Sequence, residues 1–330
     1  MLRSRRWKAR VRGYAPPHCR QLVSQTKNLS ERLLTAILDP DNRLFTLARH
    51  GRRPPSALGA IAVVFVMLAL ALIPGQMLAR FVVRWFRSGI LSIAEPIISS
   101  VAMLPIYLGL WVWLRLLSKR PFWTLGLERK HALRRALRGA LIAGFMMAVT
   151  AGLSIATGAS LAPGLLQTMG LAALGIRFSS LLAYFVQGPA EEVLFRGWLL
   201  PVIGARYRPW IGVLVSSLIF SMAHAQSPGI TPLGFLNLFL FGVFAAVYAL
   251  AESGLWGICA WHAVWNWTMG DLLGFATDGI PHSGLLSSIR ADGPDIITGG
   301  AFGLEGGLAC TTVFLIAIVT IAMRTRRHAG

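Results

Sequence analysis

The stretch from Leu181 to Pro201 reads LLAYFVQGPAEEVLFRGWLLP. It is an apolar run that carries two adjacent carboxylates, Glu191 and Glu192, and one arginine, Arg196. A charged side chain inside a membrane helix costs free energy, so it usually marks a functional site or a required ion pair. The rest of the sequence indicates whether this run lies in a membrane and what its charges do there.

The composition is that of a polytopic membrane protein. The 330 residues are 55% hydrophobic and only 14% charged, with a mean hydropathy of +0.61, which is too apolar for a soluble domain of this size. The net charge is +19. The Lys and Arg residues lie in the N-terminal tail and between apolar runs, as topology signals do. We therefore expect a surrounding lipid bilayer and no nucleic-acid partner.

The apolar runs predict an all-α fold, a polytopic membrane helix bundle of about eight transmembrane helices, since each run approaches the roughly 20 residues that span a bilayer. Residues 1–55 are expected to form a basic cytoplasmic N-terminal tail, and residues 56–330 the transmembrane bundle. The spans are expected near 57–79, 91–114, 136–157, 174–200, 210–228, 232–251, 254–273 and 299–323.

The charges between these runs predict the orientation. The loop from Arg115 to Arg138 holds eight Lys or Arg residues, and the C-terminal region carries RTRR. Because basic loops stay in the cytoplasm, we expect both termini there, with the bundle in a bacterial inner (plasma) membrane. The first external turn, with Arg80, Arg84 and Arg87, is an exception to this pattern.

Few polar side chains fall inside the expected spans. Of seven histidines, only His224 and His262 do so, and Asn266 follows His262 at a spacing that places both on one helix face. Glu191 and His224 are about equally distant from the turn that joins their spans. In an antiparallel helix hairpin, such residues lie at similar depth.

The two glutamates are expected to divide their roles. Glu192 and Arg196 are four residues apart and can pair on one helix face. Neighbouring residues differ by about 100° around a helix, so only one of the glutamates can point at the histidines. We expect Glu192 to pair with Arg196 and Glu191 to face His224, His262 and Asn266.

Two kinds of chemistry fit this set of residues. In one, Glu191 is a general base for water, one histidine orients that water, and Asn266 with the other histidine stabilises the oxyanion. In the other, Glu191, His224 and His262 bind a divalent metal such as zinc. The helical HExxH zinc motif is absent. The residues alone leave both readings open.

Three short motifs resemble a known family. EEVLFR at Glu191–Arg196, FSMAH at Phe220–His224 and HAVWN at His262–Asn266 are similar, in order and spacing, to the EExxxR, FxxxH and HxxxN elements of the CAAX prenyl protease and bacteriocin-processing (CPBP, or Abi) intramembrane endopeptidases. The similar core covers about residues 174–274. The resemblance implies an eight-helix fold with a cavity open toward the cytosolic side.

The resemblance also implies roles for the matched residues. Glu191 would be the catalytic base and His224 its partner, while His262 and Asn266 would stabilise the oxyanion. Structural support of the site would come from Glu192, Arg196 and Phe220. The family is described both as glutamic proteases and as metalloproteases, so zinc stays open.

The expected function is therefore that of an intramembrane endopeptidase acting on a membrane-associated or lipidated peptide or protein. The alternatives are a non-catalytic immunity or scaffold protein of the same fold and a proton-coupled transporter. In the transporter, Glu191 and the histidines would relay protons.

Overall fold

The computed structural model describes residues 37–52, 54–85, 91–158, 160–164, 170, 172–290 and 293–329. Within these ranges the regular structure is helical apart from two four-residue strands, so the predicted all-α class is confirmed. Most of the predicted basic tail, residues 1–55, lies outside them. The described part of that tail contains the short helix α3 (Arg43–Arg49), whose first turn is capped by the side chain of Asn42.

The helices of the described chain follow the order of the predicted spans. Five helical stretches are long and apolar enough to cross a membrane: Ala57–Leu78, Ser100–Ser118, Ala132–Ala156, Pro232–Glu252 and Leu308–Thr325. These stretches make the chain an integral membrane protein, while a count of eight transmembrane helices is not confirmed. The main helices are α4 (Ala57–Leu70), α5 (Gln76–Trp85), α6 (Leu91–Trp113), α7 (Ala132–Ala156), α9 (Ala172–Glu192), α10 (Leu200–Arg206), α11 (Pro209–Ala223), α12 (Pro232–Glu252), α13 (Trp256–Asn266) and α15 (Leu308–Ala329).

Two helices are shorter than the predicted spans. Helix α11 ends at Ala223, and the chain turns through residues 224–231 instead of continuing to 228. Helix α15 begins at Leu308 rather than near 299, because the preceding segment is rich in glycine. Gly299 and Gly303 adopt φ values of 87° and 103°, which lie in the left-handed region and end a regular helix.

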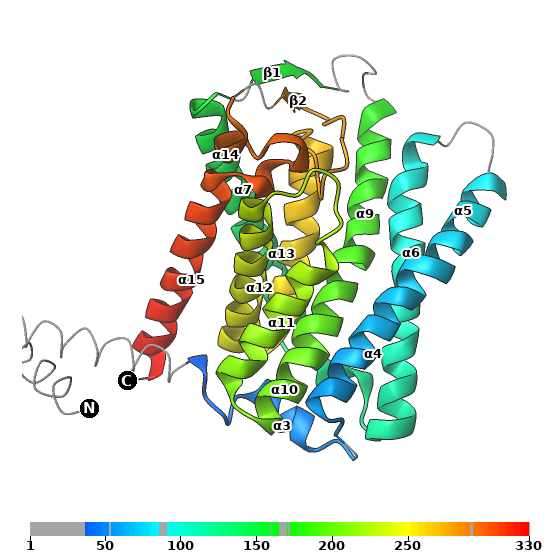
Figure 1. The fold of residues 1–330 in the computed structure, drawn as a ribbon, viewed down its shortest axis with the longest axis vertical. Helices are drawn as coiled ribbons and strands as arrows, with labels where there is room; N and C mark the ends of the chain where they lie inside the picture. The colour runs from blue at the N-terminus through cyan, green and yellow to red at the C-terminus, as the bar shows by residue number, and fades with distance from the viewer. Residues whose placement is uncertain are drawn as a thin grey trace, which may run out of the picture.

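Helix α13 lies in the middle of the bundle, between α7 and α9 (Figure 1). The crossing of α7 and α13 is close because both helices carry glycine at the contact. A Cβ atom on Gly139 would stand only 1.9 Å from the carbonyl oxygen of Gly257. Helix α12 packs against α11 and α15. Fully buried aromatic rings fill the space between these helices, including Phe241, Phe244, Trp261, Trp265 and Phe314.

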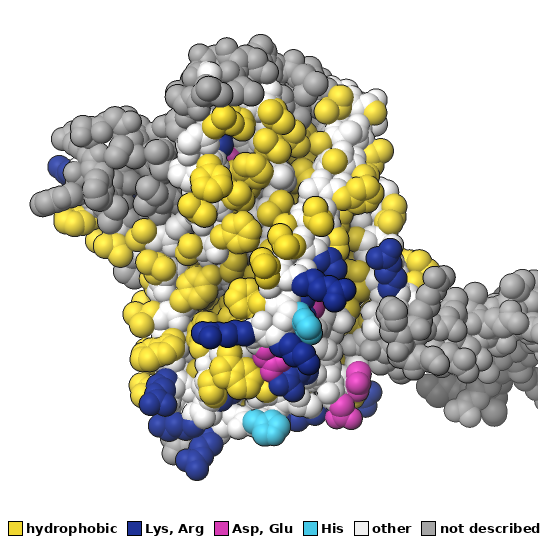
Figure 2. Space-filling view, turned by 180° about the vertical axis from the view of Figure 1, so that it is seen from behind, with side chains coloured by type: hydrophobic (Ala, Val, Ile, Leu, Met, Phe, Trp, Pro, Cys, Tyr) yellow, Lys and Arg dark blue, Asp and Glu magenta, His cyan; other side chains and the backbone are white. Residues whose placement is uncertain are grey.

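The two ends of the bundle differ in charge. At one end lie α3, α10 and the loop between α6 and α7, and we call this the basic end (Figure 1). At the other, the strand end, β1 (Ser160–Pro163) pairs antiparallel with β2 (Ser287–Arg290). On the face shown in Figure 2, Lys and Arg gather mainly toward the basic end, and hydrophobic side chains cover the middle. Helix α5, with exposed Arg80 and Arg84, lies toward the strand end.

Candidate active site

Glu191 and Glu192 are the last two residues of α9, at a point where the helix geometry changes. Pro189 lies inside α9 and cannot donate a helical hydrogen bond. The π-helical segment η4 (Val193–Leu199) follows directly. Helix α13 changes in the same way after Asn266, where the π-helical segment η5 (Trp267–Leu272) begins. Such π-helical turns are frequent at functional sites because they redirect the side chains around them.

Glu192 is fully buried and lies between two cationic or polar partners. Its Oε1 accepts from Nη1 of Arg196 at 3.1 Å, which is the predicted pair, and lies 2.8 Å from Nδ1 of His262. The second contact differs from the expectation that His262 turns toward Glu191. The close packing of α9 and α13 explains the difference, since a Cβ on Gly188 would come within 3.1 Å of the His262 ring.

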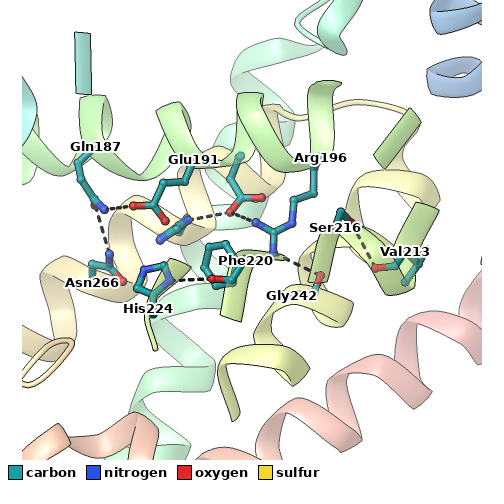
Figure 3. A network of polar contacts seen from close by, with 11 residues as sticks. Gln187, Glu191, Arg196, Val213, Ser216, Phe220, His224, Gly242 and Asn266 are labelled. Atoms are coloured by element: carbon teal, nitrogen blue, oxygen red, sulfur yellow. Dashed lines mark hydrogen bonds and ion pairs between the residues drawn. The ribbon is translucent and has the colours of Figure 1, made fainter. Parts of the chain in front are cut away.

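Glu191 faces a different set of partners. Its Oε1 accepts a hydrogen bond from Nε2 of Gln187 at 2.6 Å, and Oε1 of Gln187 accepts from Nδ2 of Asn266 at 3.3 Å. Figure 3 shows this chain of amides beside His224. Both His262 and His224 interact electrostatically with Glu191. Sequence reasoning missed Gln187, although its position one helical turn before Glu191 was a usable signal.

His224 is held at the end of α11. Its Nδ1 lies 2.9 Å from the carbonyl oxygen of Phe220. A carbonyl can only accept, so Nδ1 carries the proton in this contact. In the neutral ring Nε2 is then the unprotonated nitrogen, able to accept a hydrogen bond from water or substrate.

Phe220 packs against two members of the site and against the core residue Phe241. Its ring centroid lies 4.4 Å from the guanidinium carbon of Arg196 and 4.8 Å from the ring of His224. The ring also stacks on Phe241 at 5.2 Å. A buried arginine over an aromatic face gains a cation–π attraction. Phe220 therefore keeps the Arg196 side and the His224 side of the site together.

A cavity of about 530 Å³ contains part of this cluster. Glu191, Gln187, His224 and Asn266 line it, whereas His262 and Glu192 are not among its lining residues. His262 is 3% exposed. The sequence predicted one facing group of Glu191, His224, His262 and Asn266. In the structure, Gln187, Glu191, His224 and Asn266 line the cavity. Glu192, Arg196 and His262 form a separate, fully packed group beside it.

The cavity extends from Glu191 toward the strand end, where Asp278, Ile280 and His282 line it. The resemblance to the endopeptidase family implied a cavity open toward the cytosolic side, and the loop charges implied a cytoplasmic basic end. The lining also includes Leu68, Leu72 and Gln76 of the stretch from α4 to α5, and both expectations stay predictions.

The described residues contain no preformed set of metal ligands. In the part of the chain that the structure describes, no three His, Cys, Asp or Glu side chains come together as a metal site. Nδ1 of His262 is already engaged with Glu192. Binding of zinc by Glu191, His224 and His262 stays a prediction from the sequence.

A known protein family matches the segment of the chain that carries the candidate site. Residues 173–268 match the family model described as Type II CAAX prenyl endopeptidase Rce1-like. This segment is an Rce1-like domain. It contains all three motifs and agrees with the resemblance to CPBP endopeptidases. The domain runs from the start of α9 to η5 and therefore carries Glu191, His224, His262 and Asn266.

One curated protein is similar to part of this chain. It is described as "Uncharacterized 24.3 kDa protein" from Escherichia coli, and it is 39% identical over 79 residues, or 23% of this chain. The match covers 36% of that protein's length. No solved structure was found to match the chain.

Proposed function

We propose that the protein is an intramembrane endopeptidase that cleaves peptide bonds with a water molecule activated by Glu191. The observation that carries the proposal is the position of Glu191. It is the one motif glutamate that lines the cavity, and it does so beside His224 and Asn266 within the Rce1-like domain. The family description supports a peptidase that acts on peptides or proteins at the membrane.

The first step is removal of a proton from water. The Glu191 carboxylate accepts the proton, and the resulting hydroxide attacks the carbonyl carbon of the scissile bond. His224 faces the same cavity, and its Nε2 can accept a hydrogen bond from that water because Nδ1 is bonded to Phe220. The hydrogen bond from Gln187 holds the carboxylate in place.

The second step is collapse of the tetrahedral intermediate. Its oxyanion requires hydrogen-bond donors, and Nδ2 of Asn266 is a donor at the cavity wall. Glu191 then returns its proton to the leaving amide nitrogen, the C–N bond breaks, and a carboxylate and an amine leave. His262 acts through Glu192 as a positioning residue in this proposal, since that contact fixes its ring.

The membrane placement is part of the proposal. The charge difference between the two ends supports a cytoplasmic basic end with both termini on that side. The membrane would be the inner membrane of a bacterium, crossed by eight helices. The substrate would be a peptide or protein segment held at the membrane surface or by a lipid chain.

The test is cleavage of a peptide panel by purified protein in detergent, with lipidated and leader-type peptides as candidates. We expect wild-type protein to cleave at least one peptide and Glu191→Gln protein to cleave it about 10²- to 10⁴-fold more slowly, because an amide cannot accept the proton. A metal chelator should leave the rate unchanged. Loss of the rate with chelator and recovery with zinc would replace the glutamate mechanism by a metal mechanism.

If folded wild-type protein leaves every peptide intact, the result favours a non-catalytic scaffold or immunity protein. A proton-coupled transporter would instead show flux in proteoliposomes that depends on Glu191 without any cleavage.

A further inference from the structure

A second cavity lies at the basic end, where the first turns of α7 meet the last turn of α12. Its volume is about 290 Å³, and it shares no lining residue with the cavity that contains Glu191. We call it the basic cavity. Its lining consists of His131, Arg134, Arg135, Arg138, Ala251 and Glu252. The proposed peptidase mechanism uses none of these side chains.

The three arginines of the basic cavity face a single carboxylate. The Glu252 side chain is 2% exposed and lies 2.7 Å from Nη2 of Arg138 and 3.8 Å from Nε of Arg135. The same carboxylate accepts a hydrogen bond from the backbone nitrogen of Gly257 at 3.0 Å. One carboxylate balances one guanidinium group, so two positive charges of the lining stay uncompensated.

Arg134 contributes much of this excess. Within the described ranges of the chain, no hydrogen bond or ion pair joins its exposed side chain to another residue. The acidic residue of the preceding loop, Glu128, is bonded to Arg43 and does not line the cavity. A guanidinium group presents a planar fork of N–H donors that matches phosphate oxygens. The basic cavity therefore has the charge and the donors to bind a phosphate group.

An apolar ridge on α7 begins beside the basic cavity. Leu133, Leu137, Leu141 and Phe145 follow one another at intervals of four residues and are between 56% and 76% exposed. Residues at this spacing lie on one face of a helix, and Leu141 follows Arg138 by three residues. Helix α7 is long and apolar enough to cross a membrane, so the exposed ridge faces lipid chains.

The basic cavity lies where lipid headgroups are expected. Its arginines belong to the first two turns of the apolar helix α7, and the ends of a membrane span lie at headgroup level. On the face shown in Figure 2, basic side chains border the lower edge of the hydrophobic band. Basic clusters beside a span attract anionic lipid. A free anion would use the cavity alone, whereas a lipid would use both the cavity and the ridge.

We propose that the basic cavity binds the phosphate of an anionic phospholipid, whose acyl chains lie along the ridge of α7. Arg134 and Arg138 are its main donors, since each guanidinium group carries five N–H groups. The proposal does not depend on peptidase activity. It does connect the lipid to the bundle, because Glu252 pairs with Arg138 and also holds Gly257 at the start of α13.

The experiment is native mass spectrometry of the purified full-length protein in detergent with equal amounts of phosphatidylglycerol and phosphatidylcholine. Both lipids carry a phosphate, but only phosphatidylglycerol has a net negative charge. We expect the protein to retain phosphatidylglycerol in preference. Arg134→Gln should weaken its binding about fivefold, which corresponds to about 1 kcal/mol for one basic residue. Arg134→Lys keeps the charge and should recover most of the affinity.

Lys130→Gln is the matched control. It removes one positive charge from an exposed loop residue near α7 that does not line the cavity, so it should keep the wild-type affinity. Equal losses in Lys130→Gln and Arg134→Gln would show a diffuse positive surface and overturn the proposal. Equal retention of the two lipids by wild-type protein would overturn it as well.

Thermal unfolding separates a lipid from a free anion. A ligand that binds only the folded state raises the thermal midpoint, so phosphatidylglycerol should raise that of the wild type more than that of Arg134→Gln. Without lipid the two midpoints should coincide, because Arg134 has no partner within the described chain. Sodium phosphate should leave the wild-type midpoint unchanged. A rise with sodium phosphate as large as that with phosphatidylglycerol would assign the cavity to a free anion and overturn the lipid proposal.

Discussion

At the scale of single residues, the account depends on the separate surroundings of two adjacent carboxylates. The i, i+4 spacing was enough to predict the pair of Glu192 and Arg196. The partner of His262 could not be predicted in the same way. Which of two neighbouring glutamates a histidine on another helix meets depends on how α9 and α13 cross, and the sequence pattern contains no information on that crossing.

Gln187 provides a prediction at this scale. Replacing it with leucine removes the hydrogen bond to Glu191 and the link to Asn266. A hydrogen bond to a charged group contributes about 1.5–3 kcal/mol, so we expect kcat to fall about 10- to 100-fold. Steady-state cleavage rates measure the effect. The exposed Gln226 is the control, and Gln226→Leu should keep the wild-type rate. An unchanged rate in Gln187→Leu protein would exclude a supporting role.

At the scale of helices and loops, hydropathy predicted the order of the helices better than their ends. The predicted span 210–228 ran past the true end of α11 at Ala223, although the polar Gln226 and Ser227 and the helix breakers Pro228 and Gly229 follow there. Near residue 299 the high glycine content was the better signal. Gly299, Gly300 and Gly303 have positive φ angles, and α15 begins only at Leu308.

The contact between α9 and α13 gives the prediction at this scale. In Gly188→Ala protein, the new methyl group would stand 3.1 Å from the ring of His262 and from the backbone nitrogen of Ala263. Overpacking of a tight contact typically costs about 1–3 kcal/mol. We expect a lower thermal midpoint and slower cleavage, because His262 must move relative to Glu192.

Gly144→Ala is the matched control, since a Cβ at this position in α7 meets nothing within 4 Å. Alanine is favoured over glycine inside a helix, so its midpoint should equal or slightly exceed that of the wild type. Equal midpoints for Gly188→Ala and wild type would show that the two helices are not in close contact at Gly188.

At the scale of the whole molecule, the charges at the basic end and the apolar composition predicted a membrane protein with two unlike ends. The position of the cavity could not be predicted from them. It depends on how helices that are distant in the sequence pack around Glu191, among them α4, α9 and α11.

The pH dependence of unfolding is a whole-molecule prediction that rests on Glu305. This carboxylate lies in the segment before α15, accepts a hydrogen bond from Trp265, and is 5% exposed. Burial raises its pKa from 4.5 to about 7. The folded protein therefore binds a proton that the unfolded chain releases between pH 4.5 and 7, so this group lowers stability as the pH rises through that interval.

We expect the wild-type thermal midpoint to fall more between pH 5 and pH 8 than that of Glu305→Gln protein, which lacks the titrating group. Parallel pH profiles for the two proteins would contradict the assignment. Asp39→Asn, at an exposed site near the basic end, is the control and should follow the wild-type profile.

The central claim is that Glu191 performs the chemistry and Glu192 maintains the structure, and one paired measurement tests it most directly. Cleavage rate and thermal midpoint are measured for Glu191→Gln and Glu192→Gln proteins. We expect Glu191→Gln to lose cleavage by about 10²- to 10⁴-fold with a wild-type midpoint. Glu192→Gln should lower the midpoint strongly, because breaking a buried ion pair costs about 3–5 kcal/mol. Wild-type cleavage by folded Glu191→Gln protein would contradict the account.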